Sequence, residues 1–278
     1  MKALIDTEVY LFRAAAACEM EAEWAPDDWT YICRHGDAQA LFQDSIAEIL
    51  DTVAKATHTL AAMRPVLVFS AGVSFRYGVW PTYKANRKKH RKPAGYRKLK
   101  EWAANAAVSR GWEVVELPDI EGDDVLGVLY EEGDVICSID KDMLTLPGFH
   151  FRNGEVIEVS RAEADLNFYT QALTGDASDN YPGCPGYGPE TALKLLGGGR
   201  ILEPYNHTFT RGARKGESET RWEPGPEGSP WEIVISAFAS KGLSKRHAIT
   251  QARCARILRP GEYDLSTHTV RLWEPPVT

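Results

Sequence analysis

The sequence predicts an α/β protein with a mostly parallel central sheet and helices on both faces. Short apolar segments with strand character alternate with helical patterns through the first half of the chain, and this alternation is typical of a parallel sheet covered by helices. The 278 residues, 44% hydrophobic and 26% charged, are ample for a buried core. The expected strands cover residues 3–5, 66–70, 114–117 and 135–139.

Segments with helical spacing separate these strands. Asp37 is the expected N-cap of a long helix, because apolar residues within positions 42–60 recur at near-helical intervals. Further helices are expected at residues 95–109 and 125–131. Strands and helices together predict an α/β domain over residues 1–160.

The second half of the chain predicts smaller elements. An Asn-Gly pair at 153–154 between two extended runs predicts a β-hairpin. Ser160 and Glu163 form a capping box for a helix that ends near Leu173. We therefore expect a largely helical region over 161–278, with further helices at 189–197, 231–240 and 245–258 and a loop or mobile hairpin at 203–230.

Composition excludes several classes of protein. The five cysteines are scattered and form no Cys-x-x-Cys pair, which argues against a disulfide framework or structural zinc and suits a reducing compartment. The N-terminus carries Asp6 and Glu8 where a signal peptide needs an apolar core. No run reaches the ~18 apolar residues of a transmembrane helix. We expect a soluble, cytoplasmic protein, monomeric and without a membrane partner.

Acidic residues follow the predicted strands. Because ligands of open α/β sheets bind beyond the carboxyl ends of the strands, six of these acids can converge on one edge. Three of them lie in the stretch DIEGDDVLGV, which opens a helix. The six are Asp6, Glu121, Asp123, Asp124, Asp140 and Asp142, and Asp176 and Asp179 lie in a later loop.

Such a group of carboxylates predicts bound cations. Its burial is costly unless cations neutralise it. Oxygen ligands without histidine or cysteine favour Mg²⁺ or Mn²⁺ over zinc, and two such ions about 3.5–4 Å apart commonly serve phosphodiester hydrolysis. The alternative is that Asp123 and Asp124 only stabilise a helix N-terminus through its dipole. For either residue alone this alternative is stronger, but eight acids in this arrangement favour the metal site.

A basic segment, YKANRKKHRKPAGYRKLK, lies between two of the expected strands. Residues 84–100 hold nine Lys or Arg and no Asp or Glu, although the whole chain has a net charge of −7. Contacts to phosphates supply affinity for nucleic acid without sequence information, and interleaved aromatic residues can stack on bases. A solvated run of charge is the usual alternative. The position beside the acidic edge favours nucleic-acid binding.

A glycine-rich loop, GCPGYGPETA, precedes a helix in the second half. Gly183, Gly186 and Gly188 place backbone N–H groups where they can bind a phosphate. Many turns between helices use glycine for geometry alone, but the position directly after Asp176 and Asp179 favours phosphate binding.

Together these segments resemble the metal-dependent 5′-nucleases, which include flap endonucleases and phage 5′→3′ exonucleases. The resemblance rests on LID at 4–6 and on YKANR, EGDD, SIDKD and TGDASDNYPGCPGYGPETALKLL, in the family's order and spacing. The basic segment and CARILRPGEYD are most similar to the phage branch. The resemblance implies hydrolysis of DNA near a 5′ end or 5′ flap, in phage replication (RNA primer removal), recombination or host DNA degradation.

The resemblance also implies a metal site and its ligands. The six acids at the sheet edge would hold the main Mg²⁺ or Mn²⁺ site, with Asp6 and Asp124 among the catalytic residues. Asp176 and Asp179 would complete a second site, as a two-metal mechanism requires. Lys84 and Arg87 would reach the phosphate being cut from the base of a flexible arch near residues 80–100.

The DNA contacts implied by the resemblance lie in the arch and the glycine loop. The arch would bind DNA with Tyr83 as a stacking surface, and an RNA/DNA hybrid is a further candidate substrate. The glycine loop would belong to a helix–hairpin–helix module that binds the duplex backbone, with a monovalent cation such as K⁺ at its carbonyls. The residues implied are Tyr83, Lys84, Arg87, Lys88, Lys89, Arg91, Lys92, Gly183, Gly186 and Gly188.

Two positions depart from the family pattern. Glu190 stands where the family usually has a lysine, which weakens the phosphate contact there. Ala71, next to Ser70, stands where the family's second strand usually ends in a metal-binding aspartate. One alternative is therefore a DNA-binding protein impaired in catalysis, by nature or by deliberate substitution. Another is a PIN-type endoribonuclease, which would need neither the arch nor the glycine loop.

Overall fold

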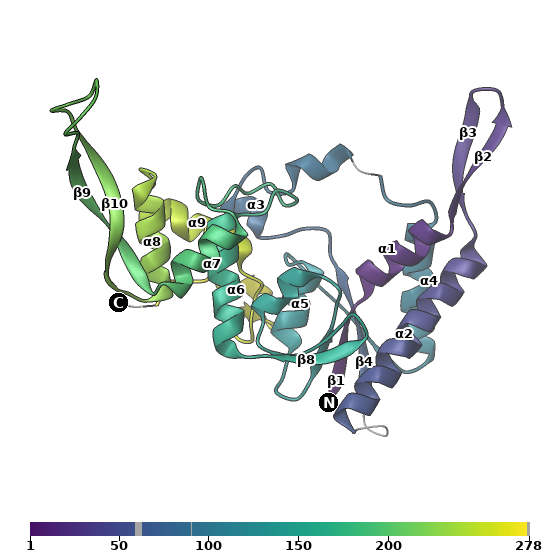
Figure 1. Cartoon of the computed structure of the whole chain (residues 1–278). Helices are drawn as coiled ribbons and strands as arrows, with labels where there is room; N and C mark the ends of the chain where they lie inside the picture. Colours follow the sequence, from purple (N-terminus) through teal and green to yellow (C-terminus); the bar gives the residue numbers. More distant parts are fainter. Residues whose placement is uncertain (59–62, 90, 277–278) are drawn as a thin grey trace. The chain divides into compact units, whose positions relative to one another are not determined.

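The computed structural model describes residues 1–58, 63–89 and 91–276 (Figure 1). The chain forms two compact units: unit 1 comprises Met1–Phe75, Lys88–Glu163 and Ile257–Arg271, and unit 2 comprises Arg76–Arg87, Ala164–Arg256 and Leu272–Thr278. The predicted division into 1–160 and 161–278 does not include two segments in which the chain passes from one unit to the other. Arg76–Arg87 packs with the later part of the chain, and Ile257–Arg271 returns to unit 1.

Unit 1 is built on the predicted, mostly parallel sheet, and the predicted fold class is confirmed. Its strand order is β5-β4-β1-β6-β7-β8, and within it β8 pairs antiparallel with β7 while the other neighbours pair in parallel. The Asn-Gly turn predicted at 153–154 joins β7 to β8. The strands are β1 Lys2–Asp6, β4 Arg64–Ser70, β5 Glu113–Leu117, β6 Val135–Cys137, β7 Gly148–Arg152 and β8 Glu155–Val159.

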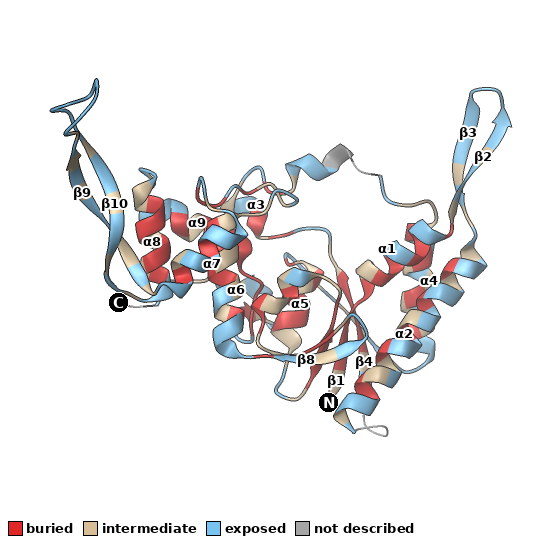
Figure 2. Ribbon diagram, viewed as in Figure 1, coloured by how far each residue is buried: buried red, intermediate tan, exposed pale blue. Residues whose placement is uncertain are grey.

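Helices cover both faces of this sheet, and alternate residues of each strand face them. Ile5 of β1 belongs to the core shared with α1, α2 and α4, whereas Leu4 belongs to the core on the other face with α5 and Leu258. Burial is correspondingly continuous through most of the central strands β1, β4 and β6, whereas the edge strands β5 and β8 are largely half-buried or exposed (Figure 2). The helices are α1 Thr7–Ala17, α2 His35–Thr57, α4 Tyr96–Ser109 and α5 Gly122–Leu129, followed by the 3₁₀ turn η2 Lys141–Thr145 and the short strands β11 Tyr263–Asp264 and β12 Thr269–Val270.

Several elements of unit 1 differ from the prediction. α1 and a hairpin of β2 Glu19–Ala25 and β3 Asp28–Cys33 were not expected. Asp37 is not the N-cap of α2, because that helix begins two residues earlier and Asp37 pairs with Arg34. The predicted helical residue Leu60 lies outside the described residues.

Unit 2 has its own core, around Phe168, Trp231 and Phe238. The buried side chain of Arg76 ties the first segment of the unit to α9, because it donates to the carbonyl oxygens of Cys254 and Arg256. The expected helices are present, and residues 203–230 form most of a hairpin. The elements are α3 Arg76–Val79, η1 Ala85–Lys89, α6 Arg161–Thr174 (which begins in unit 1), α7 Pro189–Gly197, β9 Arg200–Thr208, β10 Ser218–Glu227, α8 Pro230–Ser240 and α9 Lys245–Ala255. In the described part of the chain, no helix has the length and apolarity to cross a membrane.

We predict that Gly127→Ala destabilises unit 1. Gly127 lies within α5, and a Cβ built on it would meet the carbonyl oxygen of Leu258 at 2.0 Å, so backbone must move. The expected loss is roughly 1–3 kcal/mol of unfolding free energy, measured by urea denaturation. Gly36→Ala, in helix α2 with open space at the Cβ position, is the control and should be neutral or slightly stabilising. Equal stability of the two variants would contradict the close approach.

Candidate active site

Two predicted acids meet at the carboxyl edge of the sheet in unit 1. Asp6 ends β1, and Asp140 lies just beyond β6, the neighbouring parallel strand. Ser138 connects them: its hydroxyl donates to Asp6 Oδ2 at 2.7 Å and accepts the Asp140 N–H at 3.0 Å. Asp140 Oδ1 in turn accepts the N–H of Asp142 at 2.9 Å. Parallel pairing of β1 with β6 therefore brings these acids together, as the sequence predicts.

Burial makes the carboxylate of Asp6 difficult to ionise. The side chain is 5% exposed. Its pKa is raised to about 6, because burial outweighs the hydrogen bond from Ser138 and the negative charge of Asp140 adds to the effect of burial. A buried oxygen donor that holds its charge at this cost suits a hard divalent cation, which would stabilise the ionised form.

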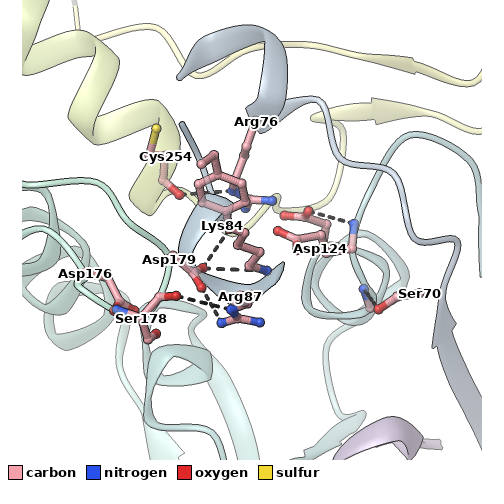
Figure 3. Close-up of polar contacts among 12 residues, drawn as sticks. Ser70, Arg76, Lys84, Arg87, Asp124, Asp176, Ser178, Asp179 and Cys254 are labelled. Carbon is pink, nitrogen blue, oxygen red and sulfur yellow. Dashed lines mark hydrogen bonds and ion pairs between the residues drawn. The ribbon is translucent and has the colours of Figure 1, made fainter. Parts of the chain in front are cut away.

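The acids of the EGDD stretch lie at the start of α5. Asp124 is fully buried, and its two oxygens accept the N–H groups of Glu121 (3.1 Å) and Leu258 (3.0 Å). The first of these bonds belongs to a capping box with Glu121 at the N-cap. The alternative weighed above was that this residue stabilises the helix N-terminus through the helix dipole; in the structure Asp124 does stabilise that end of α5, by a capping hydrogen bond (Figure 3). Asp123 and Glu121 are half-buried beside it.

Ser70 ends β4 and Ala71 follows it, where the family pattern expects an aspartate, and Lys100 of α4 contacts this strand end. The hydroxyl of Ser70 accepts the N–H of Gly122 at 2.9 Å and so positions the first turn of α5. Lys100 Nζ donates to the Ser70 carbonyl at 3.3 Å and to Glu8 at 2.7 Å, and it also pairs with Glu116 at 3.5 Å. Sequence reasoning assigned no role to Lys100. The only sequence signal for a positive charge at the end of β4 was the place of Lys100 in the basic segment that follows this strand.

The predicted metal ligands do not form a complete site by themselves. Within residues 1–58, 63–89 and 91–276, no three acid, histidine or cysteine side chains are grouped so that they could hold a metal ion. The donor chemistry of Asp6 and Asp140 fits a divalent cation, but the ligand set stays a prediction.

In unit 2, a second acid gathers the predicted phosphate-binding residues. Asp179 accepts the hydroxyl of Tyr83 at 2.7 Å, pairs with Lys84 at 3.7 Å and accepts a hydrogen bond from the Arg87 guanidinium (Figure 3). Arg87 Nε also donates to the Ser178 carbonyl, and Ser178 N–H donates to Asp176 at 2.6 Å. The structure therefore brings Lys84, Arg87 and Asp179 together.

Lys84 itself adopts an uncommon backbone conformation in this arrangement. Its φ is +54°, in the left-handed region that non-glycine residues seldom adopt. The Lys84 N–H donates to the carbonyl oxygen of Asp179 at 2.8 Å, which fixes the strained residue against the loop. Strain of this kind often marks functional positions.

The structure corrects the assignment of Tyr83 and shows how two basic residues, Arg91 and Lys92, are held; their DNA binding stays a prediction. Tyr83 is 3% exposed, so its ring belongs to the core of unit 2 and cannot act as a stacking surface for a base. Arg91 forms a two-point ion pair with Glu19 of β2 and lies 3.5 Å from the centroid of the Tyr31 ring, so it anchors the basic segment to the β2–β3 hairpin. Lys92 Nζ lies over the Tyr96 ring. The side chains of Lys88 and Lys89 lie outside what the structure describes.

The glycine loop folds as a tight turn between α6 and α7. Gly183 is buried, and its N–H donates to Gln251 at 2.8 Å, so the prediction that it binds phosphate is wrong. The close approach of its backbone to Gly175 leaves no room for a Cβ. The Gly188 N–H donates to Thr191 within the cap of α7. Gly186 is exposed, with a φ of +83°.

A cation lies beside this loop that the sequence did not identify. A Cβ built on Gly186 would lie 3.6 Å from Lys241 Nζ, and the same ammonium group lies 5.6 Å from the ring centroid of Tyr187. Lys241 is exposed at the end of α8. Because more than fifty positions separate Gly186 from Lys241, no local pattern could pair them. Lys241 supplies positive charge next to α7, whose second residue is Glu190.

A comparison with known families decides the class of this protein. A family model described as the 5′–3′ exonuclease N-terminal resolvase-like domain matches residues 2–170. The chain belongs to the 5′–3′ exonuclease family. This membership confirms the resemblance to 5′-nucleases and the prediction of a nuclease.

Similarity to phage members of this exonuclease family extends over nearly the whole chain. The exonuclease of Escherichia phage T7 is 33% identical over 98% of this chain and 93% of its own length. The exodeoxyribonuclease of Enterobacteria phage T3 is 33% identical over 98% and 92%. The prediction of the phage branch is thus confirmed.

Solved structures of low sequence identity share the fold. The T5 D15 protein co-crystallised with metal ions has a TM-score of 0.52 at 16% identity, covering 91% of both chains. A T5 5′-exonuclease with bound zinc also has a TM-score of 0.52, at 16% identity over 92% of this chain and 93% of that one.

We predict that Asp6→Asn abolishes activity and stabilises the fold when no divalent cation is bound. With a pKa raised to about 6, ionised Asp6 destabilises the folded state progressively as the pH rises from about 4 to about 6, and by roughly 3 kcal/mol above that. In EDTA, the variant should therefore have the higher unfolding free energy at pH 7.5, with the difference vanishing near pH 3.5.

Asp44→Asn, on the exposed face of α2, is the control for this substitution. It should change neither activity nor the pH dependence of unfolding. A variant Asp6→Asn that unfolds like the wild type at every pH would show that the carboxylate carries no buried charge.

Proposed function

We propose that this protein hydrolyses DNA phosphodiesters near 5′ ends and at 5′ flaps, with divalent metal ions as cofactors. One observation supports this most: in a member of the 5′–3′ exonuclease family, Asp6 and Asp140 meet at the carboxyl edge of a parallel sheet, the position at which open α/β sheets bind their ligands. The buried, hard-to-ionise oxygen donor at this edge is suited to cation-dependent chemistry.

The proposed cofactors are two Mg²⁺ or Mn²⁺ ions. Ions of this kind neutralise the charge of a phosphodiester and activate a water molecule for its hydrolysis. The residues that would hold them at the sheet edge are Asp6, Glu121, Asp123, Asp140 and Asp142, with Asp124 holding the helix that carries two of these acids. Asp176 and Asp179 are the proposed ligands of the second site.

The remaining residues would bind and orient the substrate. Lys84 and Arg87 would bind phosphate groups of the DNA, with Asp179 holding both side chains in place until then. The exposed Gly186, with Lys241 beside it, would bind the backbone of the duplex, and a monovalent cation such as K⁺ is a further candidate ligand of this loop. Among the proposed substrates is the RNA/DNA hybrid left by a replication primer.

We further propose roles in phage DNA replication, recombination or breakdown of host DNA. The named phage relatives are exonucleases of T7 and T3. A second candidate, a member impaired in catalysis, is favoured by one observation: Ala71 follows β4 at the sheet edge and cannot bind a metal. The PIN-type endoribonuclease is disfavoured by the full-length similarity to phage exonucleases.

We predict that the double substitution Lys84→Ala/Arg87→Ala lowers the rate of cleavage of a 5′-flap substrate in Mg²⁺ by roughly 10²–10³-fold. The reason is that each positive side chain would stabilise the negative charge on the phosphate in the transition state. The slope of log affinity against log salt, measured in Ca²⁺, should fall by about two. Lys55→Ala with Arg110→Ala, exposed cations on α2 and just after α4, is the matched control. A double variant with wild-type salt dependence would remove these residues from the DNA.

We predict that Ala71→Asp raises turnover more than about tenfold, because it restores a carboxylate at the end of β4. Binding in Ca²⁺ should change little. Val73→Asp, exposed two residues further on, controls for added negative charge. Equal rates for the wild type and Ala71→Asp would show that this chain does not need a ligand at that position.

A further inference from the structure

The β9–β10 hairpin is a long arm anchored at one end of unit 2. At its base, the N–H of Leu202 donates to the Ser236 hydroxyl of α8 at 2.9 Å, and Ile201 packs on the core of the unit. Strand β9 has nine residues and so extends for roughly 30 Å. Figures 1 and 2 show the hairpin projecting from α8 with an exposed outer end. Neither the metal site nor the glycine loop uses it.

Charge is unevenly distributed along this arm. The tip, residues 209–216, holds three cations and no acid; Glu217 and Glu219 follow it directly, and further acids lie nearer the base at Glu203, Glu223 and Glu227. An anionic ligand would therefore be attracted by the tip and repelled by the base.

Two of the three tip cations are available for a ligand. Arg214 pairs with Glu217 at 2.8 Å and with Glu219 at 2.9 Å. The side chains of Arg211 and Lys215, both exposed, form no hydrogen bond or ion pair with the residues that the structure describes, and only the Lys215 backbone is bonded, through its N–H to the carbonyl of Gly212. A hydrogen-bonded turn presents them: the N–H of Gly216 donates to the carbonyl of Phe209 at 2.8 Å, and the Phe209 N–H donates to the carbonyl of Glu217 at 3.0 Å.

Aromatic side chains stiffen the arm below the tip. Tyr205, His207 and Phe209 occupy alternate positions and contact one another edge to face, with ring centroids 6.4 and 5.1 Å apart. Arg214 and Arg221 lie over the Phe209 ring, at 4.0 and 5.3 Å from its centroid. The ring of Phe209, the outermost of the three, is therefore already covered by side chains of the hairpin itself. This favours phosphate contact by the tip over stacking on bases.

We propose that the β9–β10 hairpin is a separate DNA-contact arm, whose tip binds phosphates of the duplex through Arg211 and Lys215. The inference rests on the proposed function, because a nuclease of this family supplies the polyanion that the tip attracts. The arm adds affinity without reading sequence and takes no part in the cleavage step, since phosphate contacts position a protein but do not specify bases.

The test compares Arg211→Ala/Lys215→Ala with the wild type on a 5′-flap duplex. In Ca²⁺, the slope of log affinity against log salt should fall by about two, and Kd at about 0.1 M salt should rise roughly ten- to sixty-fold. The cleavage rate in Mg²⁺ at saturating protein should be unchanged. Arg211→Lys/Lys215→Arg should restore the slope, and Lys55→Ala/Arg110→Ala, which removes the same charge elsewhere, should leave it at the wild-type value.

Other outcomes separate the two proposals. If the wild type binds and cuts the flap but the alanine variant has the same slope and Kd, the arm does not contact DNA and the inference fails while the proposed function stands. If the control pair lowers the slope as much, the effect is one of total charge and the inference also fails. A wild type that neither binds nor cuts the substrate overturns the proposed function and this inference with it.

Discussion

The carboxylate of Asp6 is buried where β1 ends, and its neighbours are arranged around that charge. Parallel pairing of β1 with β6 brings Asp140 to the same edge, where its charge further raises the pKa of Asp6. Ser138 offsets part of the cost by donating to one acid and accepting from the other. An apolar residue at this position would avoid the cost of burying a carboxylate, and the acid that stands there fits the cation-dependent function proposed above.

Asp179 in unit 2 is a second acid of low exposure whose negative charge must be compensated. There the negative charge is compensated within the chain, by Lys84, Arg87 and the hydroxyl of Tyr83. These donors come from a segment about ninety positions earlier in the sequence, and Lys84 accepts a left-handed backbone conformation to reach the acid. In the proposed function these two cations bind phosphate, and an acid that already holds them in place lowers the cost of ordering them on binding.

Prediction from sequence succeeded where the signal was local. The Asn-Gly turn of the β7–β8 hairpin and the Ser160–Glu163 capping box are confirmed by pairing and by hydrogen bonds within a few residues. The β2–β3 hairpin was missed because most of its residues are exposed, so it lacks the apolar alternation that predicts a half-buried strand. The burial of Tyr83 and Gly183 was missed because their partners, Asp179 and Gln251, lie far away in the chain.

The sequence by itself determined the fold class, the acids at the strand ends and the family, because strand alternation and ordered motifs are properties of consecutive residues. Only the tertiary structure decided how these residues are used. It showed Asp124 as a buried cap of α5, Arg91 as an anchor to Glu19, and Lys241 beside Gly186. Each of these depends on contacts between distant segments, and hydrogen bonding and burial in such contacts follow from packing rather than from local pattern.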